Sequence, residues 1–161
     1  MLHCDPQHFA RLAGLLARYG LQLAPVPDNA AIPGSYWGEP EAGLVAHSVH
    51  ARADTPVHSV LHEAGHVICM DAARRAQLYV DAGGEFAEED AVCYLQIVLA
   101  GELGLSAMEI CADMDAWGYT FRLGSAHAWF TQDASDARAW LVQRDLLTEA
   151  GAPTFRLRQA A

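Results

Sequence analysis

The sequence predicts an α+β fold that is mostly helical and carries one short β-sheet. Apolar residues recur at spacings of three and four over about residues 5–19 and 56–77, and a nearly continuous apolar run fills residues 91–100. These two observations indicate helices. A third indicates the sheet, because inward and outward positions alternate along residues 43–52. With 161 residues the chain fits one domain with a substantial core.

The N-terminal part combines one helix, one long connection and one strand. Residues 5–19 predict an amphipathic helix, with Asp5 as its N-cap and Gly20 at its end. Residues 21–42 are rich in proline and predict a loop that crosses the surface. Residues 43–52 are expected to form one strand just before the next helix. Three side chains are expected to pin the loop: Ile32, Tyr36 and Trp37.

The helix predicted over about 56–77 contains the motif His62-Glu63-Ala64-Gly65-His66. Gly65 costs about 1 kcal/mol relative to Ala inside a helix. We therefore expect it to permit the close approach of another element. The start of this helix has suitable residues, with Pro56 for the first helical position and Asp54 or Thr55 for the N-cap.

Two histidines four residues apart lie on one face of a helix, so His62 and His66 can bind one Zn²⁺. Glu63 projects toward the vacant side of that metal, where it can take a proton from a zinc-bound water. His58 extends the row by one turn. A third ligand from the same helix is geometrically poor, because the row runs about 12 Å along the axis. His58 is therefore expected at the surface, or at most behind the ligands.

A catalytic zinc site needs a third protein ligand. The extended pattern H-E-x-x-H-x-x-G-x-x-H fails, because Cys69 and Ala72 occupy its glycine and histidine positions. A helix predicted over residues 85–100 offers a carboxylate instead. Gln96 is the only polar residue of its apolar run, which predicts that its line along the helix faces solvent. Glu89 lies close to that line, whereas Glu88 and Asp90 flank the buried side of the helix and Glu88 has the longer side chain. The order of preference for the third ligand is therefore Glu88, Glu89 and Asp90. The alternative is an acidic first turn with no metal contact.

These residues resemble the gluzincin zinc metallopeptidases, in which H-E-x-x-H is followed by a glutamate on a later helix. The run from Glu88 to Leu95 is also similar to a helix of the small ImmA/IrrE-type metallopeptidases. The resemblance covers about residues 43–104, and residues 99–104 depart from the ImmA-like pattern. It implies a zincin-like domain with His62, His66 and Glu88 as ligands and Glu63 as base. It also implies that the strand edges the active-site cleft, where an extended peptide can pair with it.

The C-terminal third predicts helices over about 106–117 and 125–147 and a frayed tail over 151–161. Hydrolysis of a peptide bond needs a donor that holds the developing oxyanion. The connector and the start of the following helix offer three candidates: Tyr119, Arg122 and His127. The alternative is that the aromatic residues of this connector only pack against the core.

The composition limits which classes of partner and which cell compartment the sequence predicts. The net charge of −10 argues against nucleic acid and anionic membranes, and it weakly favours basic or neutral substrates. The N-terminus lacks the basic start and long apolar run of a signal peptide. The four cysteines form no C-x-x-C pair, which is typical of reduced thiols and predicts a cytoplasmic protein.

The sequence therefore predicts a zinc-dependent metallopeptidase, a hydrolase with Zn²⁺ as cofactor and a peptide or protein as substrate. The alternative from another class is a non-catalytic zinc-binding regulatory or interaction protein. A third possibility is an incidental motif in a metal-free helical domain.

Overall fold

The computed structural model describes residues 1–35 and 37–160, so Tyr36 lies outside the described residues. This part of the chain is α+β, as predicted. It has seven α-helices, one short 3₁₀ helix and a three-stranded mixed sheet. In chain order these are α1 (Pro6–Ala17), β1 (Gln22–Pro25), β2 (Gly43–Val45), β3 (Ser48–Ala51), α2 (Val57–Cys69), α3 (Ala72–Gln77), α4 (Phe86–Glu102), α5 (Ala107–Trp117), η1 (Arg122–Gly124), α6 (Ala126–Gln132) and α7 (Ser135–Gln143).

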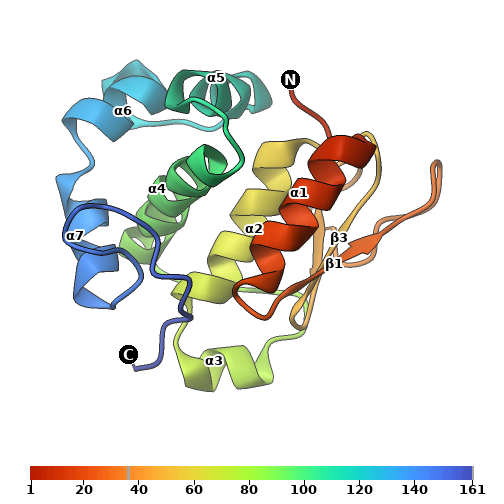
Figure 1. Cartoon of the computed structure of the whole chain (residues 1–161), viewed down its shortest axis with the longest axis horizontal. Coiled ribbons are helices and arrows are strands. Elements are labelled where there is room, and N and C mark those ends of the chain that lie inside the picture. Colours follow the sequence, from red (N-terminus) through yellow and green to blue (C-terminus); the bar gives the residue numbers. More distant parts are fainter. Residues whose placement is uncertain (36, 161) are drawn as a thin grey trace.

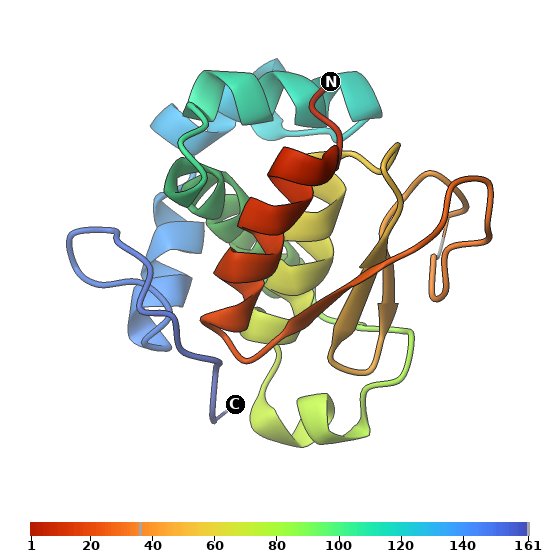
Figure 2. The ribbon, with the colours of Figure 1, turned by 45° about the vertical axis from the view of Figure 1, so that its right-hand side comes forward.

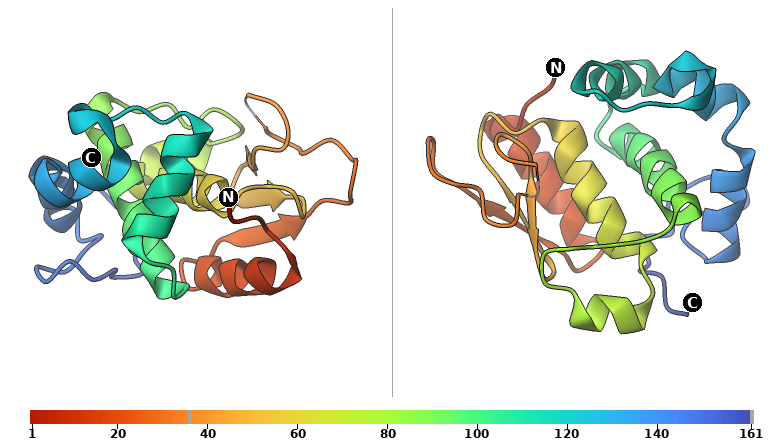
Figure 3. Two further views of the ribbon diagram at one scale, coloured as in Figure 1. Left: turned by 90° about the horizontal axis from the view of Figure 1, so that it is seen from above. Right: turned by 180° about the vertical axis from the view of Figure 1, so that it is seen from behind.

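Helix α2 is central. It lies between α1 and α4 in Figure 1, and the view from behind in Figure 3 gives the same order. Helices α5 and α6 lie across one end of α2 and α4, and α7 packs on the other side of α4. Each turn of α2 is therefore covered by neighbouring elements. Ten of its thirteen residues are buried, and the partly accessible ones are His62, Glu63 and His66.

The small sheet packs beside α1 and α2, as Figure 2 shows. Its middle strand is β3, which pairs in parallel with β1 and antiparallel with β2. Leu23 of β1 and Leu44 of β2 both lie opposite Val49 of β3, and all three are buried. This apolar row attaches the sheet to the core and fixes the position of β2 relative to α2.

Helices α2 and α4 approach closely at Gly65. A methyl group placed on the Cα of Gly65 would lie 3.0 Å from Cγ1 of Val92. This confirms the expectation that the small residue inside the motif permits another element to come near. The close contact brings the first turns of α4 next to the histidines of α2.

The predicted single helix over 56–77 is wrong, because the chain turns between α2 and α3. Asp71 caps α3 by accepting a hydrogen bond from the backbone nitrogen of Arg74 at 2.9 Å. The buried guanidinium of Arg75 donates to the carbonyl oxygens of Val67 at 2.9 Å and Met70 at 2.6 Å. These bonds satisfy carbonyl groups that a continuing helix would have used.

The start of α2 also differs from the prediction. Pro56 occupies the N-cap position rather than the first helical position, and no side chain caps the helix. The hydroxyl of Thr55 instead accepts a hydrogen bond from the backbone nitrogen of Arg52 at 2.9 Å. Thr55 therefore orders the turn before the helix.

Three other predicted segments are divided. Residues 43–52 form a hairpin of β2 and β3 rather than one strand, with Ala46 at a φ of +52° in the turn. The proline-rich segment 21–42 begins with β1, and within it Ile32 is buried whereas Trp37 is exposed. Residues 125–147 form α6 and α7 with a break at residues 133–134.

The helices predicted over 5–19 and 106–117 are confirmed as α1 and α5. Asp5 caps α1 by accepting from the backbone nitrogen of His8 at 2.9 Å. Gly118 ends α5 in the left-handed region, at a φ of +111°. No helix in the described part of the chain combines the length and the apolar character needed to cross a membrane.

We expect Gly65→Ala to lower the free energy of unfolding by about 1–2 kcal/mol, because the added methyl overpacks the α2–α4 contact. The helix propensity of Ala, worth about 1 kcal/mol, offsets only part of this. In a Val92→Ala background the obstructing methyl is gone, and the same change is expected to be neutral or stabilising. Chemical denaturation of the four proteins measures both effects. An equal cost in both backgrounds would contradict the role given to Val92.

Candidate metal centre

Three donor side chains converge between α2 and α4. The Nε2 atoms of His62 and His66 are 3.1 Å apart, and the carboxylate of Glu89 lies 3.2 Å from the first and 3.6 Å from the second. Ligands about 2.0–2.1 Å from a tetrahedral Zn²⁺ are separated by about 3.3 Å. The three separations scatter around that value. The donor atoms present therefore fit a zinc-sized ion.

A buried glutamine of α4 fixes the ring of His62. The side-chain nitrogen of Gln96 donates to the carbonyl oxygen of His58 at 2.8 Å, so its amide oxygen is the group that faces Nδ1 of His62 at 3.1 Å. An amide oxygen can only accept a hydrogen bond, so Nδ1 carries the proton. In the neutral imidazole of His62 the lone pair is then on Nε2, which faces the other donors. Partners of this kind orient a ligand and select its tautomer.

His66 is held differently. Its Nδ1 is buried and has no hydrogen-bond partner among the described residues. Burial and the neighbouring His62 lower the pKa of His66 to about 4. The imidazole is therefore neutral at neutral pH, which is the form that binds a metal.

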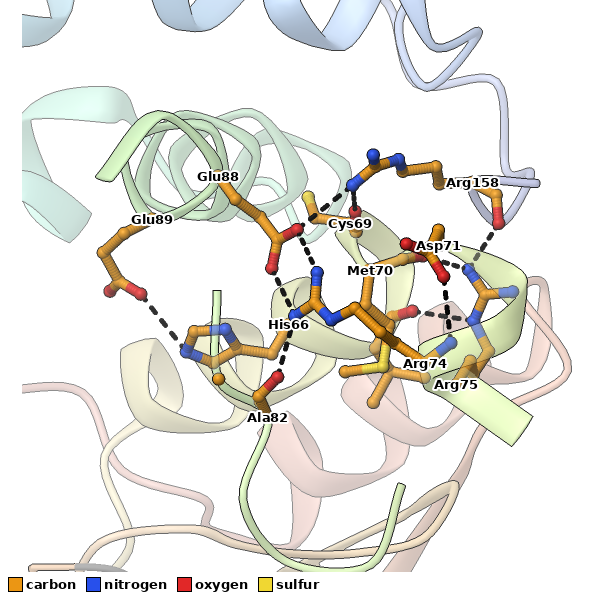
Figure 4. Close-up of polar contacts among 12 residues, drawn as sticks. His66, Cys69, Met70, Asp71, Arg74, Arg75, Ala82, Glu88, Glu89 and Arg158 are labelled. Atoms are coloured by element: carbon orange, nitrogen blue, oxygen red, sulfur yellow. Dashed lines mark hydrogen bonds and ion pairs between the residues drawn. The ribbon is translucent and has the colours of Figure 1, made fainter. Parts of the chain in front are cut away.

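The structure does not bring Glu88 to the histidines, which corrects the predicted order of ligands. Glu88 is only 3% exposed and accepts hydrogen bonds from Arg74 at 2.6 and 2.9 Å and from Arg158 at 3.1 Å. Figure 4 shows Glu88 turned toward these arginines and Glu89 turned toward His66. Adjacent helical positions differ by about 100°, so one of the two acids joins the ion pairs and the other faces the donors. Asp90, the third candidate, lines a separate hollow with Arg122 and Asp133.

The prediction that Gln96 faces solvent is also wrong. This error explains why Glu88 was preferred to Glu89 as the third ligand. Gln96 is 0% exposed. It lies seven residues after Glu89, so both side chains are on the same line of α4. That line faces α2 and the donor group. Helical spacing alone gives this common line but not which side of the helix faces solvent.

Glu63 shares a hollow of about 260 Å³ with the three donors. Burial and the nearby carboxylates of Glu41 and Glu89 raise the pKa of Glu63 to about 7, although His62 opposes this. The remaining walls come from two segments far apart in sequence. We call this space the metal-site hollow; its lining residues are Trp37, Glu41, His62, Glu63, His66, Val80, Asp81, Ala82, Gly83 and Glu89.

The three candidate oxyanion donors do not line the metal-site hollow. Tyr119 comes nearest, because its hydroxyl lies 3.3 Å from the side-chain nitrogen of Gln96 and its ring packs edge-on against His62. It thus lies behind the ligand. Arg122 pairs with Asp133 at 2.7 Å, and His127 lies on α6.

His58 is not the surface residue that the sequence predicts. It is fully buried, and its ring packs edge-on against Trp117 and Tyr119. Burial lowers its pKa to about 4. His58 stays outside the donor group, and its carbonyl oxygen, which holds Gln96, is the part that supports the site.

The outer edge of β2 is partly covered. The backbone nitrogen of Leu44 donates to Gly34 at 3.4 Å, and that of Ala46 donates to Tyr79 at 2.7 Å. These donors are the ones that an added strand would use. The resemblance implied that an extended peptide pairs with this strand, and in the structure the chain itself occupies those positions.

Two walls of the hollow were not predicted from the sequence, the acid Glu41 and the segment 80–83. Glu41 lies with Glu39 among prolines and glycines, where two acids give no pattern that points to the histidines. Residues 80–83 connect α3 to α4, and their place beside the histidines depends on the turn after α2.

The chain matches no family model, no curated protein and no solved structure. The resemblance to gluzincins therefore rests on the motif residues and stays a prediction.

We expect Gln96→Leu to weaken metal binding about 10–100-fold, because His62 loses the partner that fixes its tautomer. Gln96→Glu keeps an acceptor for Nδ1 and is expected to bind metal within a few-fold of wild type. Titration with a competing chelator measures both affinities. Equal affinities of Gln96→Leu and wild type would contradict the role of this amide, and Gln132→Leu on the exposed side of α6 is the control.

Glu88 is the shared counter-charge of two arginines. Glu88→Gln leaves the guanidinium groups of Arg74 and Arg158 without their shared counter-charge, and breaking such a buried pair costs about 3–5 kcal/mol. We expect this loss in the free energy of unfolding, measured by chemical denaturation of metal-free protein. The metal stoichiometry of the folded variant is expected to stay unchanged. A variant as stable as wild type that no longer binds metal would reverse the roles of Glu88 and Glu89.

Proposed function

We propose that this protein is a zinc-dependent peptidase, with His62, His66 and Glu89 as the metal ligands and Glu63 as the general base. The observation that carries the proposal is the convergence of the three donor atoms in a hollow that also contains the carboxylate of Glu63. Helix α2 supplies two ligands and the base, and α4 supplies the third ligand.

The donor set, together with the base Glu63 beside the first ligand, supports zinc as the metal. Two imidazoles and one carboxylate are a common set of protein ligands at catalytic zinc, and they leave a fourth position open. Glu89 is exposed, so that position can face solvent and substrate. When bound there, zinc would polarise a carbonyl group and lower the pKa of a coordinated water.

The residues in and beside the hollow then divide the work of the reaction. Glu63 takes a proton from the attacking water and transfers it to the leaving nitrogen, so that one water and one peptide bond give a carboxylic acid and an amine. Gln96 keeps the proton of His62 on Nδ1 and its lone pair on Nε2. The walls formed by the segments around Glu41 and Asp81 border the space in which a substrate would lie.

The first test is the metal content of purified protein, compared between Glu89→Ala and Asp90→Ala. We expect about one zinc per chain in wild type and Asp90→Ala, and a loss or strong weakening in Glu89→Ala, because only Glu89 reaches the histidines. The two acids are neighbours on α4, so each variant controls for the other. Wild-type protein that takes up no zinc when zinc is supplied would refute the proposal.

Activity separates the peptidase from a non-catalytic zinc protein. Glu63→Gln is expected to keep zinc and to lower the rate of peptide hydrolysis by a factor of about 10²–10⁴. Zinc-loaded wild type that cleaves none of a broad set of peptides would favour the regulatory or interaction role instead.

A further inference from the structure

The lining of the metal-site hollow is strongly acidic. It contains four carboxylates, from Glu41, Glu63, Asp81 and Glu89, and no arginine. The chain has no lysine at all, so its permanently charged cationic side chains are its ten arginines. Arg74, which donates to the carbonyl oxygen of the lining residue Ala82 at 2.8 Å, is already paired with Glu88. Arg52 is paired with Glu39 and Asp54.

Two of these carboxylates have a task in the proposed function, as ligand and as base. Of the other two, Asp81 is exposed and accepts a hydrogen bond from the backbone nitrogen of Gly83 at 3.0 Å. Glu41 is different, because it is only 8% exposed and forms no ion pair with any described residue. Its carboxylate accepts a hydrogen bond at Oε2 from the backbone nitrogen of Trp37, at 2.8 Å.

A buried carboxylate without a counter-charge is unfavourable, because burial removes its hydration and nothing replaces it fully. The fold nevertheless holds Glu41 in place. The next residue, Ala42, donates its backbone nitrogen to the hydroxyl of Ser59 at 2.9 Å. Ser59 lies one turn before Glu63 on α2, so this bond ties the acid to the helix that carries the base.

Trp37 also lines this hollow, and the residue is 82% exposed. An aromatic face and a carboxylate together favour a cation, through cation–π attraction and a charge-assisted hydrogen bond. Both groups come from the segment before β2, and the donors and Glu63 come from α2 and α4. A ligand that reaches the metal therefore meets Glu41 in the same space.

We infer that the metal-site hollow selects a substrate with a cationic nitrogen close to the scissile bond, and that Glu41 supplies the counter-charge. This inference rests on the proposed function of the same site. The cation is either the side chain of a lysine or arginine or the free amino terminus of a peptide. Both present hydrogen-bond donors that carry positive charge.

The test measures peptide binding to a zinc-supplied Glu63→Gln variant, in which turnover is slowed. Three peptides share one sequence: one is acetylated and contains citrulline, one is acetylated and contains arginine at that position, and one contains citrulline with a free amino terminus. We expect one of the two cationic peptides to bind about tenfold or more tightly than the neutral one, and its identity assigns the cation. This difference is expected to shrink as ionic strength rises.

The decisive comparison adds Glu41→Gln, which keeps the acceptor for Trp37 but removes the charge. We expect the preference to vanish in this variant and to persist in Glu149→Gln, an exposed acid outside the hollow. Thermal unfolding and zinc content verify that each variant is intact. Equal affinities for all three peptides, no binding of any of them, or a preference that survives Glu41→Gln would overturn the inference.

Failure of the proposed function gives a different result. In that case wild type does not cleave the cationic peptide, while the binding preference and its dependence on Glu41 remain.

Discussion

The close packing of α4 on α2 at Gly65 determines where every donor of the candidate centre lies. Because Gly65 has no side chain, α4 packs close to α2 at this point, and the first turn of α4 brings Glu89 next to His62 and His66. Two turns later on the same line, Gln96 reaches the ring of His62 and the backbone of α2. One helix contact therefore supplies both a donor and the partner that orients another donor.

The same contact divides the acidic first turn of α4 between two tasks. Glu88 points away from the histidines and joins two arginines, one from α3 and one from the C-terminal tail. The prediction of a frayed tail over 151–161 is therefore wrong at Arg158, which is buried and ties the tail to the helix that carries Glu89. The two acids are adjacent in sequence but separated by about 100° around the helix, so a structural role and a donor role do not compete.

Sequence patterns predict the helices well but not the direction in which a polar line faces. The spacing of His62 and His66 and the small residue between them predicted the face of α2 that meets α4. The single Gln96 in an apolar run was compatible with either a solvent-facing line or a buried polar contact. Only the position of α2 in the folded structure distinguishes the solvent-facing line from the buried contact. The breaks after α2 and at Ala46 depend on contacts from distant segments, such as Arg75 with Arg158 and Ala46 with Tyr79, which no local pattern contains.

The covered edge of β2 limits how a peptide could be held in the proposed active site. Leu44 and Ala46 already donate to the loop before the strand and to the segment after α3, so these donors are not available to pair with a substrate backbone. Recognition must then come from groups that line the hollow itself. Among those, the buried carboxylate of Glu41 offers the strongest directional interaction with a ligand, because the fold gives it no counter-charge. A site closed to strand pairing and open to one cation would recognise a side chain or a terminus rather than an extended backbone.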